Sequence, residues 1–294
     1  MPIRPRRSVL YMPGSNVRAL EKAKTLAADA LILDLEDAVA PEAKERAREQ
    51  VVAAVKAGGY GKREIVIRVN GLGTPWGEAD LKAAAAARPD AILVPKVQAP
   101  ADLEAARAVL QGAGVAPAQA LWAMMETPLA IVNAAAIGAS GPGSFPLTAF
   151  VIGTNDLAKE TRASLSGGRP GMVAWLSTCV AAGRAYGIDI IDGVFNEIGD
   201  AAGLEAELSQ GRLLGMDGKT LIHPSQIEPC NRAFSPTPEE VEWARKILAA
   251  FALPENAGKG VISLEGRMVE LLHAQIAKRT VAIADMIAER EAAS

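Results

Sequence analysis

The feature that most constrains this chain is a repeat in which a short apolar run precedes an amphipathic, alanine-rich stretch. Each apolar run is mostly Val, Ile, Leu or Ala with little alternation, which is typical of strands buried on both faces of a parallel sheet. Eight such units fit a closed barrel better than an open sheet, whose halves usually carry a glycine-rich dinucleotide turn that is missing from this sequence. We therefore predict a (β/α)8 TIM barrel with strands at Ser8–Met12, Ala30–Leu35, Glu64–Val69, Ala91–Val94, Ala120–Met125, Thr148–Ile152, Ile188–Ile191 and Thr220–Ile222.

The repeat stops near Pro224, and the remaining sequence has a different pattern. It predicts a helix over Pro238–Ala252, a glycine-containing link over Pro254–Gly260 and a long helix from about Met268 to Glu289. The predicted organisation is a catalytic barrel over residues 1–228 and a C-terminal helical extension over residues 229–294.

Composition narrows the class of protein. Apolar residues make up 50% of 294 residues, enough for a large core, yet no apolar run approaches the ~20 residues of a membrane span. The net charge is −3 with scattered Lys and Arg, so neither a nucleic-acid groove nor a polybasic membrane patch is expected. The basic start up to Arg7 is followed by an apolar stretch that breaks at Pro13-Gly14, which does not fit a signal peptide and favours a cytoplasmic location.

Polar residues gather where the predicted strands end. In a barrel, side chains at the C-terminal ends of the strands face the active site. Helix caps would also place polar residues there, so each position has a purely structural alternative. The polar residues at or just after successive strands are Tyr11, the Asp34/Glu36/Asp37 group, Arg68 and Asn70, Lys96, Glu126, Asp156, Asp192 and His223.

Glu126 and Asp156 are the predicted metal ligands. Glu126 ends a wholly apolar strand, and a charge at that buried position needs a partner such as a cation. Asp156 follows the next strand, so the two carboxylates can converge, although Asp156 could instead cap a helix. Two carboxylates that leave the other positions to water and substrate are the usual magnesium arrangement. We predict one Mg²⁺ ion at this site.

Each of the neighbouring charged residues has two possible roles. Glu36 and Asp37 are predicted to hold metal-bound waters, or else to cap the second helix. Arg68 is predicted to clamp a substrate carboxylate with two hydrogen bonds, and it can also balance the nearby acids. Lys96 is interpreted as a partner of these acids rather than a Schiff-base nucleophile, because the acids would keep it protonated.

These residues, in this order, resemble the citrate lyase β-subunit-like family, which includes malyl-CoA, citramalyl-CoA and β-methylmalyl-CoA lyases and belongs to the aldolase/citrate lyase barrel superfamily. The resemblance covers nearly the whole chain, and its specificity comes from seven motifs at matching barrel positions. The matching segments are Arg7–Asn16, Leu33–Val39, Ile67–Asn70, Val94–Val97, Met125–Thr127, Gly153–Ala158 and Gly218–Ile227.

The resemblance implies roles for particular residues. Glu126 and Asp156 would bind Mg²⁺, Glu126 would also line the substrate pocket, and Arg68 would contact the acid substrate. Such enzymes are usually trimers or hexamers in which the C-terminal segment closes over a neighbour's site, so a homotrimer or homohexamer is expected. The positions implied to contact acyl-CoA are Tyr11, Arg18, Lys22, Ile222 and His223.

One departure concerns the acid/base residue. Many lyases of the family carry Gly-x-Met-Ile/Val-Asp near the C-terminus, whereas this chain reads Gly266-Arg-Met-Val-Glu270. Glu270 would replace the Asp, mark a subgroup with other substrates or thioester hydrolysis, or be a plain surface residue.

The predicted activity is Mg²⁺-dependent cleavage or formation of a malyl-CoA-like 3-hydroxyacyl-CoA, giving an acyl-CoA and a 2-oxo acid. Arg68, Glu270, Glu36 and Asp37 are the catalytic candidates. The alternatives are a malyl-CoA thioesterase on the same scaffold, an aldolase acting on free 2-oxo acids, and a subunit of a citrate-lyase-type complex that is inactive alone.

Overall fold

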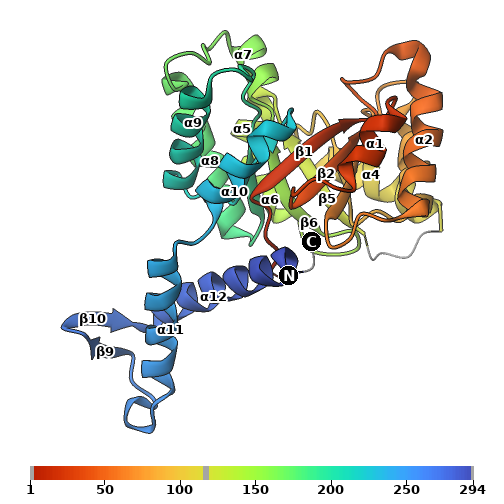
Figure 1. Ribbon diagram of the computed structural model, residues 1–294. Helices are drawn as coiled ribbons and strands as arrows, with labels where there is room; N and C mark the ends of the chain where they lie inside the picture. Colours follow the sequence, from red (N-terminus) through yellow and green to blue (C-terminus); the bar gives the residue numbers. More distant parts are fainter. Residues whose placement is uncertain (1–2, 115–118, 293–294) are drawn as a thin grey trace. The chain divides into compact units, whose positions relative to one another are not determined.

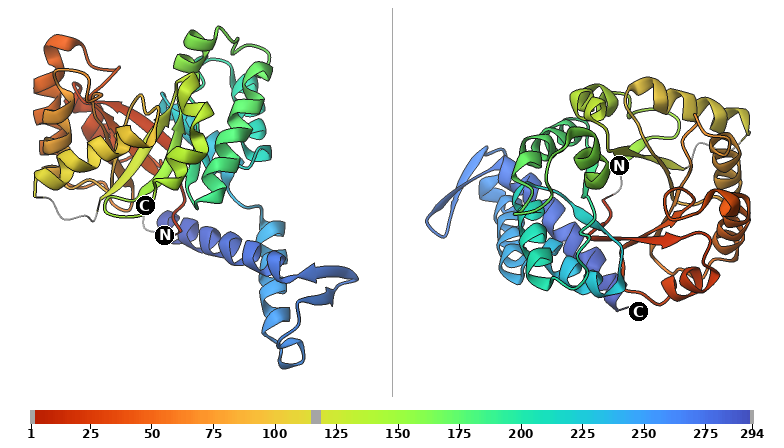
Figure 2. Two further views of the ribbon diagram at one scale, coloured as in Figure 1. Left: turned by 180° about the vertical axis from the view of Figure 1, so that it is seen from behind. Right: turned by 90° about the horizontal axis from the view of Figure 1, so that it is seen from above.

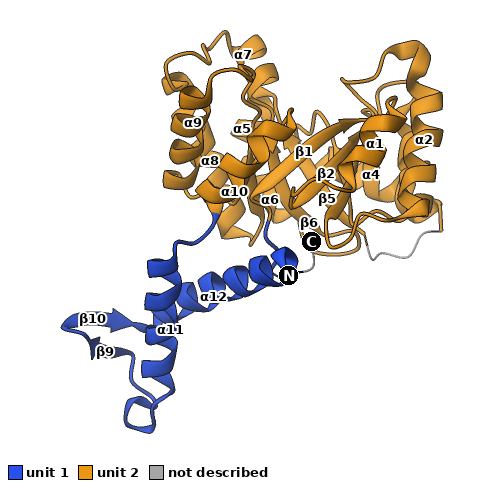
Figure 3. Ribbon diagram, in the orientation of Figure 1, with its two compact units in different colours: residues 1–5, 235–294 blue, residues 6–234 orange. Residues whose placement is uncertain are grey.

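The computed structural model describes residues 3–114 and 119–292, and the chain forms two compact units (Figure 3). The larger unit spans residues 6–234, and the smaller one combines residues 1–5 with residues 235–294. Helix α10 (Ile227–Phe234) is part of the larger unit. Each unit is described by itself below.

The larger unit is a closed barrel in which every strand pairs in parallel with the next, and β8 pairs with β1 (Figures 1 and 2). The predicted (β/α)8 barrel is thus confirmed. The last two strands begin and end at other residues than predicted. The strands are β1 (Ser8–Pro13), β2 (Ala30–Asp34), β3 (Glu64–Arg68), β4 (Ala91–Val94), β5 (Ala120–Met125), β6 (Leu147–Ile152), β7 (Asp189–Asp192) and β8 (Gly218–Leu221).

Helices surround the strands, as the view along the barrel in Figure 2 shows. Among the described residues, no helix is both long and apolar enough to cross a membrane. The helices of this unit are α1 (Val17–Ala23), α2 (Lys44–Ala57), α3 (Gly77–Ala87), α4 (Pro100–Gly112), α5 (Pro128–Val132), α6 (Ala134–Ala139), α7 (Thr154–Thr161), α8 (Val173–Ala185), α9 (Ala201–Leu213) and α10, with 3₁₀ turns at Pro41–Ala43, Pro170–Met172 and Pro224–Gln226.

The strands bury both of their faces, which explains why their sequences lack alternation. One apolar cluster fills the barrel interior and includes Ile32, Val66, Trp122 and Val151. A larger cluster lies between the strands and the helices. Side chains therefore alternate along each strand between the barrel axis and the helix layer, and this alternation decides which polar residues reach the mouth.

Arg6 closes the N-terminal end of the barrel interior. Its guanidinium binds Glu64, the first residue of β3, at 2.7 and 2.8 Å, and Asp189, the first residue of β7, at 2.7 Å. It also lies 5.1 Å from the centre of the Trp122 ring. These contacts satisfy the buried charges at the end of the barrel opposite the polar strand exits.

The smaller unit corrects one prediction. The helix expected from about Met268 begins instead at Leu271, because Arg267–Glu270 (β10) pairs antiparallel with Val261–Leu264 (β9). Glu265 and Gly266 both have positive φ, which a two-residue hairpin turn of the primed type requires. Glu is an unusual residue for the first of these positions, so the turn was not evident from the sequence.

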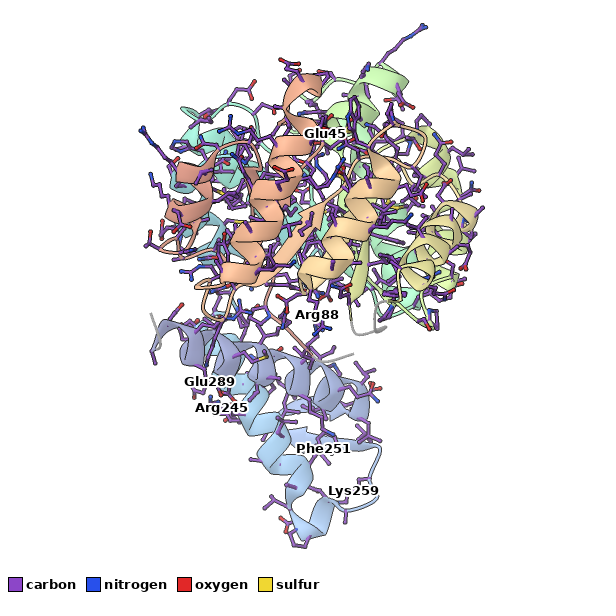
Figure 4. The ribbon with its side chains drawn as sticks, turned by 90° about the vertical axis from the view of Figure 1, so that its right-hand side faces the viewer. Glu45, Arg88, Arg245, Phe251, Lys259 and Glu289 are labelled. Atoms are coloured by element: carbon purple, nitrogen blue, oxygen red, sulfur yellow. The ribbon has the colours of Figure 1, made fainter. Side chains whose placement is uncertain are left out.

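The smaller unit has an apolar core of its own. Helix α11 (Pro238–Ala252), predicted with these bounds, packs along α12 (Leu271–Glu291) and the hairpin. Ile247, Ile262 and Val269 are buried together, and Arg245 on α11 binds Asp285 on α12 at 2.7 Å. Figure 4 labels Arg245 and Phe251 on α11. The unit is therefore held together by contacts among its own elements.

Candidate active site

Glu126 and Asp156 converge on the ammonium group of Lys96 at the C-terminal end of the barrel. Lys96 Nζ lies 2.8 Å from Asp156 Oδ2 and 3.4 Å from Glu126 Oε2, and the backbone N–H of Lys96 donates to Glu126 Oε1 at 2.7 Å. Glu126 is fully buried, and its Oε2 makes no hydrogen bond. The two carboxylates that the sequence singled out thus form one cation-binding pair.

The pKa values of Glu126 and Asp156 shift in opposite directions. Burial raises the pKa of Glu126 to about 7, although Lys96 opposes the shift. Burial also acts to raise the pKa of Asp156, but the hydrogen bond and charge of Lys96 outweigh it, so this pKa is lowered. Without a stronger cation, Glu126 is the carboxyl that holds a proton near neutral pH.

Glu126 packs directly against the backbone of Gly153, the residue that follows β6. A Cβ atom at Gly153 would lie 2.3 Å from the Cβ of Glu126, so only glycine permits this approach. Gly153 is followed at once by α7, and Asp156 occupies its first turn while its carboxylate contacts Lys96. The N-cap position belongs to Gly153, which excludes the helix-cap alternative for Asp156.

Arg68 is tied to Asp34 by a two-pronged contact. Strand register places Asp34 opposite Arg68, and Nε and Nη2 of the arginine donate to the two carboxylate oxygens at 2.6 and 2.7 Å. The guanidinium also lies 4.9 Å from the centre of the Tyr11 ring. Arg68 therefore acts as a counter-ion to Asp34, as one of its two predicted roles requires. Its Nη1 atom makes no hydrogen bond with Asp34.

Glu36 and Asp37 share this Nη1 atom. Arg68 Nη1 lies 3.0 Å from Glu36 Oε2 and 3.1 Å from Asp37 Oδ2. Burial raises the pKa of Glu36 to about 8, with Arg68 opposing the shift, and Glu36 Oε2 makes no hydrogen bond. A carboxyl group with such a pKa can exchange protons near neutral pH.

Four of the five predicted acyl-CoA contacts are exposed on the barrel, whereas Tyr11 is partly buried against the apolar cluster of the barrel interior. Arg18 and Lys22 are exposed on α1, and neither side chain pairs with an acid within the described residues. Ile222 and His223 are exposed just after β8. The Nδ1 atom of His223 interacts with Ser225, at 3.2 Å from its backbone N–H, so this histidine has a local structural role as the cap of a 3₁₀ turn.

Asp192, counted among the mouth residues on sequence grounds, faces the helix layer instead. It accepts two hydrogen bonds of 2.7 Å from Arg169 and lies 3.1 Å from Lys219 Nζ, and all three side chains are fully buried. Lys219 also pairs with Glu207 on α9. Arg169 was missed by the sequence reasoning, and only a lysine in the short strand β8 hinted at this cluster.

Glu270 belongs to the smaller unit. It ends β10 and is the N-cap residue of α12, and its backbone N–H donates to His273 Nδ1 at 2.9 Å. Its side chain is half-buried. The structure of this unit gives Glu270 a place at a helix start, and any catalytic role remains a prediction.

Comparison with known proteins identifies the family of this barrel. Residues 7–224 match the family described as HpcH/HpaI aldolase/citrate lyase. The chain belongs to this family. The (3S)-malyl-CoA thioesterase of Cereibacter sphaeroides (strain KD131) is 50% identical over 284 residues, which cover 97% of this chain and 96% of that protein. The human mitochondrial citramalyl-CoA lyase is 31% identical, covering 97% of this chain and 87% of that protein.

A solved structure of the family has a similar fold. The CitE protein of Mycobacterium tuberculosis, crystallised in complex with magnesium, acetoacetate and coenzyme A, is 28% identical with a TM-score of 0.74. The match covers 96% of this chain and 98% of that one. The predicted family resemblance is therefore confirmed, and the named relatives include both a thioesterase and a lyase.

Proposed function

We propose that this chain is a Mg²⁺-dependent hydrolase of a malyl-CoA-type thioester. The observation that carries the proposal is the Glu126–Asp156 pair at the barrel mouth, with Arg68 present for an acid substrate. The choice of hydrolysis over carbon–carbon cleavage is supported by the 50% identity to malyl-CoA thioesterase over nearly the full length of both chains. The thioesterase alternative is thus preferred to the lyase favoured from sequence.

The residues at the mouth fit a magnesium ion. Glu126 is a buried carboxylate with an oxygen that makes no hydrogen bond, and Asp156 lies beside it on the shared lysine. Mg²⁺ is usually held by one or two carboxylates, which leaves its other positions for water and substrate. When bound there, Mg²⁺ supplies a Lewis acid that polarises a substrate oxygen.

The chain's own residues supply the rest of the reaction. Arg68 Nη1 would bind the free carboxylate of the malyl group by giving up its 3.0 Å contact with Glu36 while it keeps its contact with Asp37. Glu36, whose pKa burial raises to about 8, would in its ionised form take a proton from water as the water oxygen attacks the thioester carbonyl carbon. The carbon–sulfur bond then breaks, the thiolate leaves and gains a proton, and malate is the second product. Asp37 would help to hold Arg68 in place.

Docking of acyl-CoA would use the exposed side chains at the barrel surface. Arg18 and Lys22 lie at i and i+4 on α1 and offer positive charge to phosphates. Ile222 and His223 at the β8 exit would contact the acyl arm, together with Tyr11 inside the mouth.

Carbon–carbon cleavage is the second candidate, supported by the similarity to citramalyl-CoA lyase over 97% of this chain. The products separate the two reactions. Purified protein, Mg²⁺ and malyl-, citramalyl-, β-methylmalyl- or citryl-CoA should give a hydroxy acid and free thiol by hydrolysis. Cleavage would give a 2-oxo acid that a carbonyl reagent traps. Inactivity of the purified chain on every thioester would instead support the subunit of a citrate-lyase-type complex.

We also propose a homotrimer or homohexamer in which the smaller unit covers the barrel mouth of a neighbouring subunit. Met268 on β10 and Leu271, Leu272 and Ile276 in the first two turns of α12 are 70, 52, 48 and 61% exposed, and a neighbour would bury this apolar set. Glu270 lies within this set.

The role of Glu270 gives a prediction. If it serves as an acid/base residue at a neighbour's site, Glu270→Gln should lower turnover without changing the solution mass, and Glu270→Asp should keep part of the activity. Truncation before Ser263 should leave Mg²⁺ affinity intact and reduce turnover. Steady-state kinetics and light scattering on the same samples test both points, with Glu265→Gln in the nearby turn as the control. Unchanged turnover in Glu270→Gln would show that Glu270 only caps helix α12.

Arg68 gives a second prediction. Both Arg68→Ala and Arg68→Lys should lower kcat/KM by about 30- to 150-fold, or about 2–3 kcal/mol, because an ammonium cannot bind Asp34 with two prongs and still offer a third nitrogen to substrate. Kinetics with malyl-CoA measure the loss. Arg48→Lys, whose arginine binds Asp80 on α3, is the matched control. Full activity of Arg68→Lys would show that positive charge alone suffices.

The pH dependence of metal binding follows from Glu126. Its pKa of about 7 lies above the ordinary 4.5, so protonation stabilises the metal-free fold below about pH 4.5, and this stabilisation is lost as pH rises through about 7. Mg²⁺ needs the ionised form, and its affinity should therefore fall below about pH 7, with one proton released on binding. Calorimetry at about pH 6 and about pH 8, in buffers of different ionisation enthalpy, measures both. Equal affinity and no proton release at the two pH values would contradict this account.

A further inference from the structure

Lys96 holds Glu126 in two ways at once. Its backbone has a φ of 53°, a left-handed conformation that is uncommon for lysine. In this conformation the backbone N–H of Lys96 donates to one oxygen of Glu126, while the side chain returns to the other oxygen and to Asp156. Such a backbone persists only where surrounding contacts favour it, and here those contacts are the two carboxylates.

The ammonium is the counter-charge of a fully buried acid. Glu126 has no exposed surface, and its Oε2 makes no hydrogen bond, so the cation paired with that oxygen is Lys96 Nζ at 3.4 Å. An unpaired buried carboxylate is strongly destabilising. The lysine therefore keeps the carboxylate pair assembled when no metal is bound.

The ammonium group of Lys96 takes up the position that a shared cation would occupy between the carboxylates. Mg²⁺ binds carboxylate oxygens at about 2.0–2.1 Å. The ammonium already lies against Glu126 Oε2 and Asp156 Oδ2, the oxygens that face the shared position. Two cations at this distance would repel each other, whereas the lysine side chain is 39% exposed and has a route out into solvent.

From this geometry we infer that Lys96 is a tethered cation that occupies the metal site of the free enzyme and is displaced by the divalent ion. The inference rests on the proposed metal site and goes beyond it, because it makes Lys96 a competitor of the metal rather than a ligand or catalytic group. A competitor on the same chain acts at a high effective concentration and weakens the apparent affinity of the metal. The free enzyme would thus keep its two carboxylates together before the metal binds, and its affinity for the metal would be lower as a result.

The test uses the full-length protein, Mg²⁺ alone as the probe, and the variants Lys96→Met and Lys96→Gln. Without the tethered charge, the Kd for Mg²⁺ measured by calorimetry should fall about 10-fold or more, and the unfolding midpoint in EDTA should also fall. The stabilisation that saturating Mg²⁺ gives should accordingly be larger than in the wild type. Lys96→Gln keeps a hydrogen-bond donor and serves if Lys96→Met does not fold in EDTA.

Lys159→Met is the matched control. Lys159 lies on α7, its charge also lowers the pKa of Asp156, and its side chain is exposed. Removing it deletes a nearby positive charge without emptying the shared position, so the Mg²⁺ affinity should change by less than about 3-fold. If Lys159→Met and Lys96→Met raised the Mg²⁺ affinity equally, the loss of any nearby positive charge would explain the effect, and the inference would be overturned.

The remaining outcomes separate this inference from the proposed function. Unchanged or weaker Mg²⁺ binding in both Lys96 variants, with normal binding in the wild type, would show that Lys96 assists the metal and would overturn the inference alone. A wild-type protein that neither binds Mg²⁺ in calorimetry nor gains stability from it would overturn the metal site itself.

Discussion

Replacing Glu126 with Gln, or Asp156 with Asn, is expected to lower Mg²⁺-dependent turnover by about 1,000-fold or more, because the Lewis-acid contribution of a catalytic metal is worth several kcal/mol. The fold should survive both changes. In Glu126→Gln the side-chain amide oxygen still accepts from the backbone N–H of Lys96, and Asp156 is on the first turn of α7 with only part of its side chain buried.

Calorimetry with Mg²⁺ and kinetics with malyl-CoA measure this effect. Glu160→Gln is the matched control, since Glu160 lies one turn beyond Asp156 on α7 and is exposed. It removes the same charge from the same helix and should leave both Mg²⁺ affinity and turnover near wild type. Near-normal turnover and Mg²⁺ affinity in either Glu126→Gln or Asp156→Asn would refute the assignment of the pair.

The second large effect concerns Arg169, a residue outside the mouth. Arg169→Met should lower the free energy of unfolding by about 3–5 kcal/mol, because it leaves the buried Asp192 with Lys219 as its remaining cation. Arg169 also donates to Gln210 on α9, so its loss removes one further contact between that helix and the segment that precedes α8. Urea unfolding followed by circular dichroism measures the loss.

Two further variants separate burial from charge at this position. Arg184 also pairs with an acid, Asp217 at 2.8 Å, but its side chain is 41% exposed. Arg184→Met should therefore cost about 1 kcal/mol or less. Without Arg169, the buried Asp192 and Glu207 share Lys219 as their cation, so the cluster carries one excess negative charge. Adding Asp192→Asn to Arg169→Met should therefore recover part of the lost stability by removing that excess charge. A loss in Arg169→Met no larger than that in Arg184→Met would contradict the account.

Much of the barrel could be predicted because strands buried on both faces leave apolar runs of the right length. The same property hides the direction of individual side chains, since a run without alternation does not show which residues face the axis. Asp192 was placed at the mouth for this reason, whereas its neighbour Ile191 is the one that faces the interior. The pairing of Asp34 with Arg68 likewise depends on strand register.

The smaller unit was harder to predict for a different reason. Its hairpin depends on two successive positive φ values at Glu265 and Gly266, and only the glycine signals such a turn. Val261–Leu264 shows no clear polar and apolar alternation in its sequence, and only the structure shows that Ile262 and Leu264 are more buried than Val261 and Ser263. The convergence of Glu126 and Asp156, in contrast, followed from two acids at adjacent strand ends, which needed only the order of strands in the barrel.

The most direct test of the proposed function is the fate of malyl-CoA in ¹⁸O-labelled water with the purified chain and Mg²⁺. Hydrolysis predicts malate that carries one label in its new carboxylate, together with one equivalent of free thiol and no 2-oxo acid, and EDTA should stop the reaction. Acetyl-CoA and trapped glyoxylate in equal amounts, without labelled malate, would contradict hydrolysis and assign the barrel to carbon–carbon cleavage.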